Sequence, residues 1–218
     1  MTGELPLVAE DPENWDPILL NELPTLLRAA GKPWWIAGGV AIDMFLGRTT
    51  RPHRDVDIAV LRIDQLDFQR ALAGWDLQVP VDWEGEPEKS KVLFRRWAPG
   101  EFLDRDVSQA WCRRTPSSPW SFELLYAHGN HETWKFKKDE SIQLPLPAIS
   151  SISTEGLPYL NPEIVLLHKS VSTYQAPTTE PDFEVTLPHL TPGQKIWLSE
   201  GLRRVSPDHP WLTRLEPA

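Results

Sequence analysis

The spacing of apolar residues along the first part of the chain predicts helices and strands in mixed order. Leucines recur at helical intervals between residues 19 and 27, after an Asp16-Pro17 pair typical of a helix start, and Gly31 then supplies a stop. Short runs rich in β-branched and aromatic residues predict strands at residues 33–37, 55–61, 91–97, 121–126 and 133–137. Further helices are expected at residues 40–46 and 63–73, each followed by a glycine, and residues 84–91 read as a charged turn. This order predicts an α+β protein built on a mixed α/β sheet.

The pattern becomes helical after about residue 155. Asn161-Pro162-Glu163 combines a capping residue, a first-turn proline and an acid that suits the helix dipole, and Thr191-Pro192 is a second helix start. Residues 175–181 separate the two helices as a predicted loop. We therefore expect an α/β domain at residues 1–155 and a smaller helical domain at residues 156–218.

Charge and composition narrow the possible partners. The chain has 218 residues and a formal net charge of −9, which disfavours a nucleic-acid partner and favours a small cationic one. Cys112 is the only cysteine, so the chain contains no intrachain disulfide. The acidic N-terminus does not resemble a signal peptide, and no apolar run reaches the ~20 residues that span a bilayer. We expect a cytoplasmic protein without membrane contact and leave its oligomeric state open.

Three carboxylates form the strongest candidate for a chemical site. Asp55 and Asp57 are two residues apart on a predicted strand, so both point to the same face, where they repel unless a cation lies between them. Mg²⁺ prefers such oxygen ligands together with substrate phosphates. Glu123 lies between the apolar Phe122 and Leu124, so it emerges on the opposite face of its strand from them. A salt-bridged or solvated acidic strand remains the alternative for these residues.

A glycine pair precedes the acidic residues. Gly38-Gly39 lies between a predicted strand and a predicted helix, where glycines let backbone N–H groups approach a phosphate. Tight turns also use glycine for steric reasons, so the pair has little weight alone. The order of glycine pair, Asp-x-Asp and a later acid is more specific than any of its parts.

With these motifs the chain resembles the nucleotidyltransferase superfamily with a DNA-polymerase-β-like palm. Within it, the similarity is greatest to the aminoglycoside 2″-adenylyltransferases and lincosamide nucleotidyltransferases. The matching residues are Gly38-Gly39, Ala41-Ile42-Asp43, Gly47-Arg48, Thr50-Arg51, His53, Asp55-Val56-Asp57-Ile58, Phe122-Glu123-Leu124-Leu125, Pro158-Tyr159-Leu160, Pro162-Glu163, Leu166-Leu167, Lys169-Ser170, Asp182-Phe183 and Pro207-Asp208-His209-Pro210-Trp211.

The resemblance implies a fold, a reaction and roles for individual residues. The fold would be a palm-like mixed sheet with a small C-terminal helical domain and the active site between them. The reaction would be Mg²⁺-dependent transfer of a nucleotidyl group, AMP from ATP, to a hydroxyl of a small molecule such as an aminoglycoside or lincosamide antibiotic. Asp55, Asp57 and Glu123 would hold the metal, with Glu123 also the candidate general base. Gly38, Gly39, Arg51 and Lys169 would bind the nucleotide.

The chain also departs from the pattern of these relatives. Glu123 stands where they often have aspartate, Thr178-Thr179 where a Lys-Asp pair is common, and Lys137-Lys138-Asp139 where Arg-Arg-Asp is usual. Two alternatives therefore stay open. One is a nucleotidyltransferase toxin that acts on tRNA or protein, and the other is a catalytically degraded nucleotide-binding protein.

Overall fold

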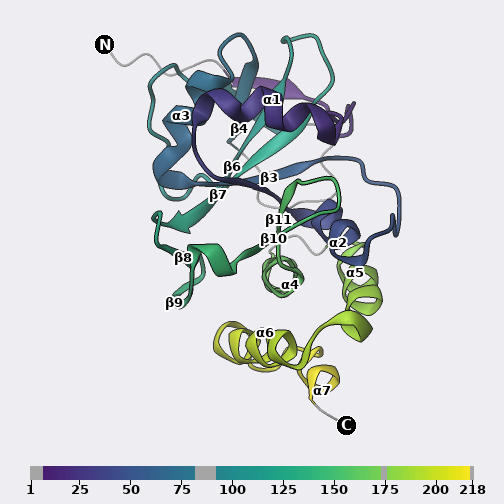
Figure 1. The fold of residues 1–218 in the computed structure, drawn as a ribbon. Helices are drawn as coiled ribbons and strands as arrows, with labels where there is room; N and C mark the ends of the chain where they lie inside the picture. The colour runs from purple at the N-terminus through teal and green to yellow at the C-terminus, as the bar shows by residue number, and fades with distance from the viewer. Residues whose placement is uncertain (1–6, 82–91, 173–175, 217–218) are drawn as a thin grey trace. The chain divides into compact units, whose positions relative to one another are not determined.

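The computed structural model describes residues 7–81, 92–172 and 176–216 (Figure 1). The chain divides into two compact units, each built from two stretches of sequence. The first unit is Met1–Trp34 with His53–Tyr126, and the second is Trp35–Pro52 with Ala127–Ala218. These units do not test the predicted division into domains at residues 1–155 and 156–218, which stays a prediction.

A sheet forms the centre of the first unit. Its strands lie in the order β1-β5-β4-β6-β7-β3. They are β1 (Leu7–Glu10), β3 (Asp57–Leu61), β4 (Asp76–Pro80), β5 (Val92–Arg96), β6 (Gln109–Arg113) and β7 (Phe122–Gly129), the last of which ends in the second unit. The pairs from β1 to β7 are antiparallel. Helices α1 (Leu23–Leu27) and α3 (Gln65–Ala71) pack against each other in this unit.

The strand register separates two faces of this sheet. Leu77, Cys112 and Phe122 are aligned across β4, β6 and β7, and they lie on one face. Trp111 and Glu123 are aligned one position further along and lie on the other face. On that second face Trp111 packs with three more aromatic rings, Trp15, Phe94 and Trp120, whose centroids lie about 5 Å apart. Glu123 is therefore next to an aromatic core.

The second unit combines two small strand groups with most of the helices. Strand β2 (Trp34–Ile36) runs parallel to β11 (Pro158–Leu160), which pairs antiparallel with β10 (Ser150–Ile152). Strands β8 (Thr133–Phe136) and β9 (Asp139–Pro145) extend the end of β7 as antiparallel neighbours. The helices are α2 (Gly38–Leu46), α4 (Pro162–Ser170), α5 (Thr179–Thr186), α6 (Pro192–Val205) and α7 (Leu212–Leu215). Parallel and antiparallel pairs thus occur together, as predicted.

Helix α4 lies at the centre of the helices in the second unit. It packs against α2, α5 and α6 (Figure 1). The approach of α6 is close at Gly201, where an added Cβ atom would lie 3.2 Å from the side chain of Leu167 on α4. Helix α6 begins with a capping box, in which Thr191 and Gln194 exchange side-chain and backbone hydrogen bonds. This cap confirms the helix start predicted at Thr191-Pro192.

The predicted helix at residues 19–27 is wrong as a single element. The structure has a 3₁₀ turn at Leu20–Glu22, α1 at Leu23–Leu27 and a second 3₁₀ turn at Arg28–Ala30, with Gly31 as the expected stop. Pro24 has no N–H to donate, so it fits only the first turn of a new helix. The expected start at Asp16-Pro17 is also wrong, because the Asp16 N–H donates instead to the Trp120 carbonyl at 2.9 Å.

Other predicted elements differ from the structure mainly in extent. Strand β3 begins at Asp57 rather than at Asp55, and α5 begins at Thr179 inside the predicted loop at residues 175–181. Strands β1, β4, β6, β9, β10 and β11 were not predicted. The charged turn expected at residues 84–91 lies outside the described residues. The strands near residues 34, 92, 122 and 133 and the helices near residues 40, 65, 162 and 192 are confirmed.

Gly129 fixes the turn between β7 and β8. Its φ of 121° lies in a region that favours glycine, and an added Cβ atom would overlap the Thr133 carbonyl. Gly129→Ala is expected to lower the free energy of unfolding by about 2 kcal/mol, which a denaturant titration would measure. The control is Gly193→Ala, since Gly193 lies in α6 with no atom within 4 Å of an added Cβ. Equal stability of the two variants would contradict the role assigned to Gly129.

Candidate active site

The three predicted metal-binding carboxylates all lie in the first unit. Asp57 opens β3, Asp55 lies two residues before it, and Glu123 is the second residue of β7. The Glu123 N–H donates to the Val56 carbonyl at 2.9 Å. This hydrogen bond places β7 beside the residue between the two aspartates. The backbone thus brings together residues almost 70 positions apart in the sequence.

The charges of these carboxylates act on one another. Glu123 is 7% exposed. Burial raises its pKa well above the usual value, the negative charges of Asp57 and Asp55 raise it further, and Arg54 opposes them. The three acids therefore share one electrostatic environment at the N-terminal end of β3.

Arg54 lies next to these carboxylates and pairs with two acids, Glu13 and Asp55. Its guanidinium donates to Glu13 Oε1 at 2.5 Å and to Asp55 Oδ2 at 3.5 Å. Burial lowers the pKa of Arg54, but the hydrogen bond that Arg54 donates to Glu13 and the charge of Asp55 outweigh burial and raise it. Arg54 therefore stays charged and offsets part of the negative charge around Asp55.

The ligand chemistry of this site suits a hard divalent cation. Asp55 is about one-third exposed, Asp57 is half-buried, and both supply carboxylate oxygens. Among the residues that the structure describes, no three His, Cys, Asp or Glu side chains converge closely enough to enclose one ion. A magnesium site that uses one or two carboxylates and completes its shell with phosphate oxygens does not need such an enclosure.

The glycine pair lies where the sequence predicts it, between β2 and α2 of the second unit. Gly38 has a φ of 58°, which a residue with a Cβ atom rarely adopts, and it is the first residue of α2. The backbone N–H groups of a first helical turn favour negative charge. Both glycines therefore remain candidates for phosphate binding.

Arg51 and Lys169, the two cations predicted to bind nucleotide, meet at Asp182 in the second unit. The Arg51 fork donates to Asp182 from Nε at 2.9 Å and from Nη2 at 3.0 Å. Lys169 Nζ lies 3.0 Å from Asp182 Oδ2. Asp182 belongs to the matching sequence motif, but its spacing alone predicts no role for it, because its partners lie on other segments.

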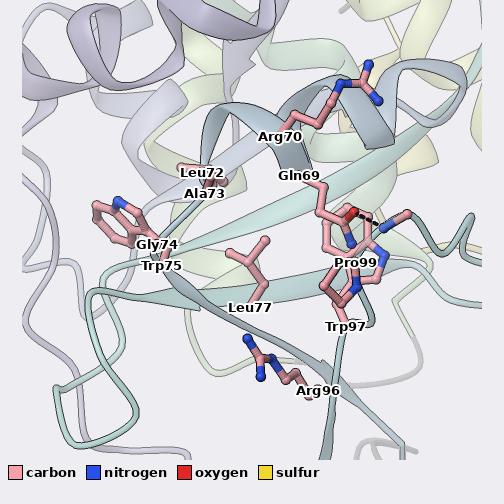
Figure 2. A pocket seen from close by; sticks show the side chains of 11 residues that line it. Gln69, Arg70, Leu72, Ala73, Gly74, Trp75, Leu77, Arg96, Trp97 and Pro99 are labelled. Atoms are coloured by element: carbon pink, nitrogen blue, oxygen red, sulfur yellow. Dashed lines mark hydrogen bonds between the residues drawn. The ribbon is translucent and has the colours of Figure 1, made fainter.

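A separate hollow of about 320 Å³ lies in the first unit beside α3 (Figure 2). Its wall includes Trp75, Leu77 and Trp97, and the Gln69 side chain at its rim accepts a hydrogen bond from the Gly100 N–H at 2.7 Å. None of the predicted site residues is among the described residues that line it.

Across the described residues, no helix combines the length and apolar character needed to cross a membrane.

A sequence match connects this chain to a known protein family. Residues 19–105 match the model of the aminoglycoside-2″-adenylyltransferase family. This range includes Gly38-Gly39, Arg51, Asp55 and Asp57, and it ends before Glu123. No curated protein sequence matches the chain.

Several solved structures are similar to this chain. The crystal structure of ANT(2″)-Ia in complex with adenylyl-2″-tobramycin is 14% identical, with a TM-score of 0.53 over 85% of this chain and 95% of that chain. The solution structure of ANT(2″)-Ia, an antibiotic-resistance factor, is 15% identical, with a TM-score of 0.51 over 84% of this chain and 90% of that chain. Lincomycin-bound LnuA, a lincosamide antibiotic adenylyltransferase, is 16% identical, with a TM-score of 0.49 over 78% of this chain and 96% of that chain.

These findings confirm the resemblance predicted from the sequence. The protein has the polymerase-β-like nucleotidyltransferase fold, and residues 19–105 are similar to the aminoglycoside-2″-adenylyltransferase family. The roles of Asp55, Asp57, Glu123, Gly38, Gly39, Arg51 and Lys169 stay predictions.

Proposed function

We propose that the protein transfers AMP from ATP to a hydroxyl of a small cationic antibiotic, with Mg²⁺ bound to its carboxylates. The observation that carries this proposal is the proximity of Asp55, Asp57 and Glu123 along β3 and β7, in a chain with this fold. Two acids at the start of a strand and a third on its neighbour would supply the oxygen ligands that phosphoryl chemistry needs.

Asp55 and Asp57 would hold the metal, with Glu123 as the third carboxylate. A bound Mg²⁺ supplies charge stabilisation to the phosphate oxygens. Glu123 is also the proposed acceptor of the proton from the attacking hydroxyl. It suits this role because it comes from a different strand than the two aspartates and because Arg54 contacts Asp55 rather than Glu123.

The nucleotide phosphates are proposed to bind residues of the second unit. Gly38 and Gly39 offer backbone N–H groups at the start of α2, and Arg51 and Lys169 offer positive charge. This assignment makes ATP, or another nucleoside triphosphate, the donor. It concerns binding of the donor and is independent of which molecule receives the AMP.

An aminoglycoside is the proposed acceptor. The matching family is described as aminoglycoside-2″-adenylyltransferase, and one structural relative was solved with adenylyl-2″-tobramycin. Aminoglycosides carry several ammonium groups, and a protein with a net charge of −9 attracts such cations over a long range. The same charge repels tRNA, which disfavours tRNA as the acceptor.

A transfer assay with mass detection tests this function directly. The protein would be incubated with Mg²⁺, each of the four nucleoside triphosphates, and a panel of aminoglycosides and lincosamides. We expect a panel member to gain the mass of AMP in the presence of ATP, together with release of pyrophosphate. Transfer to tRNA or to a protein, but to no antibiotic, would replace the proposed acceptor. ATP binding without any transfer would support a degraded site.

A further inference from the structure

Asp182 on α5 joins three segments of the second unit that are distant in the sequence. Its carboxylate accepts hydrogen bonds from Nε and Nη2 of Arg51 and pairs with the ammonium group of Lys169, all at 2.9–3.0 Å. Arg51 lies after α2, Lys169 lies on α4, and the Arg51–Asp182 pair spans 131 positions. The Asp182 cluster, defined here as these three residues, is therefore a product of tertiary folding.

The Asp182 cluster has more positive than negative charge. Two cations and one anion give a formal sum of +1 (2 − 1), in a chain whose net charge is −9. A structural ion pair needs only one cation, and a second cation adds repulsion between Arg51 and Lys169. Burial raises the pKa of Asp182, but the hydrogen bond from Arg51 and the charge of Lys169 outweigh burial and lower it. Asp182 is therefore ionised at neutral pH.

The three members of the cluster differ in their access to solvent. The side chain of Asp182 is 2% exposed, whereas that of Lys169 is 17% and that of Arg51 is 24% exposed. A molecule that approaches from solvent meets the two cations before it meets the carboxylate. The excess positive charge is thus presented outward, which is the arrangement that an anionic ligand requires.

The backbone around Arg51 is held in place as well. Thr50 donates to Asp43 Oδ1 from its N–H at 3.0 Å and from its hydroxyl at 2.5 Å, and the Pro52 carbonyl accepts from Arg51 Nη1 at 3.2 Å. Arg51 is therefore oriented from its backbone and from its guanidinium. A fixed cation loses less entropy when it binds an anion.

We propose that Asp182 is a positioning residue, which holds Arg51 and Lys169 in one arrangement to receive the triphosphate chain of the nucleotide. Asp182 acts through these two cations and does not contact the phosphates. This inference rests on the proposed function, in which Arg51 and Lys169 bind the nucleotide.

Asp182→Asn separates positioning from simple attraction. The substitution removes one negative charge, so the formal charge of the cluster rises from +1 to +2. Attraction alone would then tighten triphosphate binding. Positioning predicts the opposite, because an amide has one acceptor oxygen and cannot receive the Arg51 fork and Lys169 together. We expect about 10-fold weaker binding, as for the loss of one charge-assisted contact.

The experiment measures the dissociation constants of inorganic tripolyphosphate and of ATP with Mg²⁺ by calorimetry on the full chain. Arg51→Lys keeps the charge but not the fork, so it is also expected to weaken binding about 10-fold. The double variant should add little to either single change, because Asp182 acts through Arg51. The control is Asp139→Asn, which removes an acid of the same unit that pairs with Arg204 at 3.0 Å. It should bind tripolyphosphate as the wild type does.

Melting curves accompany every variant. Weaker binding by folded Asp182→Asn, with unchanged binding by Asp139→Asn, supports the inference, and equal or tighter binding by Asp182→Asn overturns it. Should Asp182→Asn not fold, Arg51→Lys decides, because wild-type binding by that variant also overturns the inference. Transfer activity tests the proposed function separately. A wild-type protein that binds tripolyphosphate but adenylylates nothing leaves this inference standing and removes the proposed reaction.

Discussion

Asp57→Asn is expected to lower the rate of nucleotidyl transfer at least ~1000-fold, because it replaces a charged residue that is proposed to bind the metal by a neutral amide. Asp57 opens β3 beside Asp55, and its charge acts on Glu123 across the strand pair. Loss of that charge would weaken the binding of Mg²⁺ and so of the nucleotide phosphates. The amide has nearly the same size as the acid, so the melting temperature should change little.

The control for this experiment is Asp67→Asn in α3. Asp67 belongs to the same unit and pairs with Arg70 and Lys32, but it lies on a helix and contacts none of the three carboxylates in the described interactions. Its transfer rate should match that of the wild type. Removal of the metal by EDTA should abolish transfer by the wild type, and added Mg²⁺ should restore it. An Asp57→Asn variant that keeps more than a tenth of the wild-type rate would contradict the proposed site.

The three candidate carboxylates could be selected from the sequence because the evidence for them is local, and their role in a site stays a prediction. Alternation along a strand places Phe122 and Leu124 on one face and Glu123 on the other, and the structure buries both apolar side chains completely. The same alternation predicts a shared face for Asp55 and Asp57, although β3 begins only at Asp57. Only the proximity of β3 and β7 is not local, and there the prediction depended on the family resemblance.

Interactions between distant segments account for most of what the sequence did not predict. Strand β4 contains the polar residues Asp76 and Gln78 and was not predicted, yet both residues are buried. The burial of Asp76 depends on its ion pair with Arg113 of β6, which no periodicity connects to it. The Asp182 cluster has the same origin, since Arg51 is 131 positions from its partner. In both cases a polar residue is buried because a charge elsewhere in the chain neutralises it.

Arg113 completes the most enclosed ion-pair network of the first unit's described residues. Its Nε lies 2.7 Å from Asp76 Oδ2 and its Nη2 2.8 Å from Glu10 Oε1, while the guanidinium carbon lies 4.3 Å from the centroid of the Trp120 ring. The side chains of Arg113 and Asp76 are 5% and 6% exposed. Gln78 Nε2 also donates to Asp76 at 2.8 Å. Because water is excluded, neither charge can be solvated if the other is removed.

Arg113→Met is therefore expected to lower the free energy of unfolding by about 3–5 kcal/mol, because it leaves the buried Asp76 carboxylate without its cation. The next residue supplies a matched control. Arg114 also pairs with an acid, Glu22 at 2.8 Å, and also lies over a tryptophan ring, but its side chain is 57% exposed. Arg114→Met should cost less than about 1 kcal/mol. Urea titrations of both variants measure the difference.

A second substitution shows whether the unpaired Asp76 carboxylate causes the loss of stability in Arg113→Met. Adding Asp76→Leu to Arg113→Met removes the unpaired carboxylate, so that apolar side chains of similar size replace the ion pair. Such replacements are often neutral or stabilising, so the double variant should be more stable than Arg113→Met alone. If the two changes simply add, the loss comes from the packing of Arg113 against Trp120 and its bond to Glu10 rather than from the charge on Asp76. The sign of the second change thus separates the electrostatic explanation from the packing one.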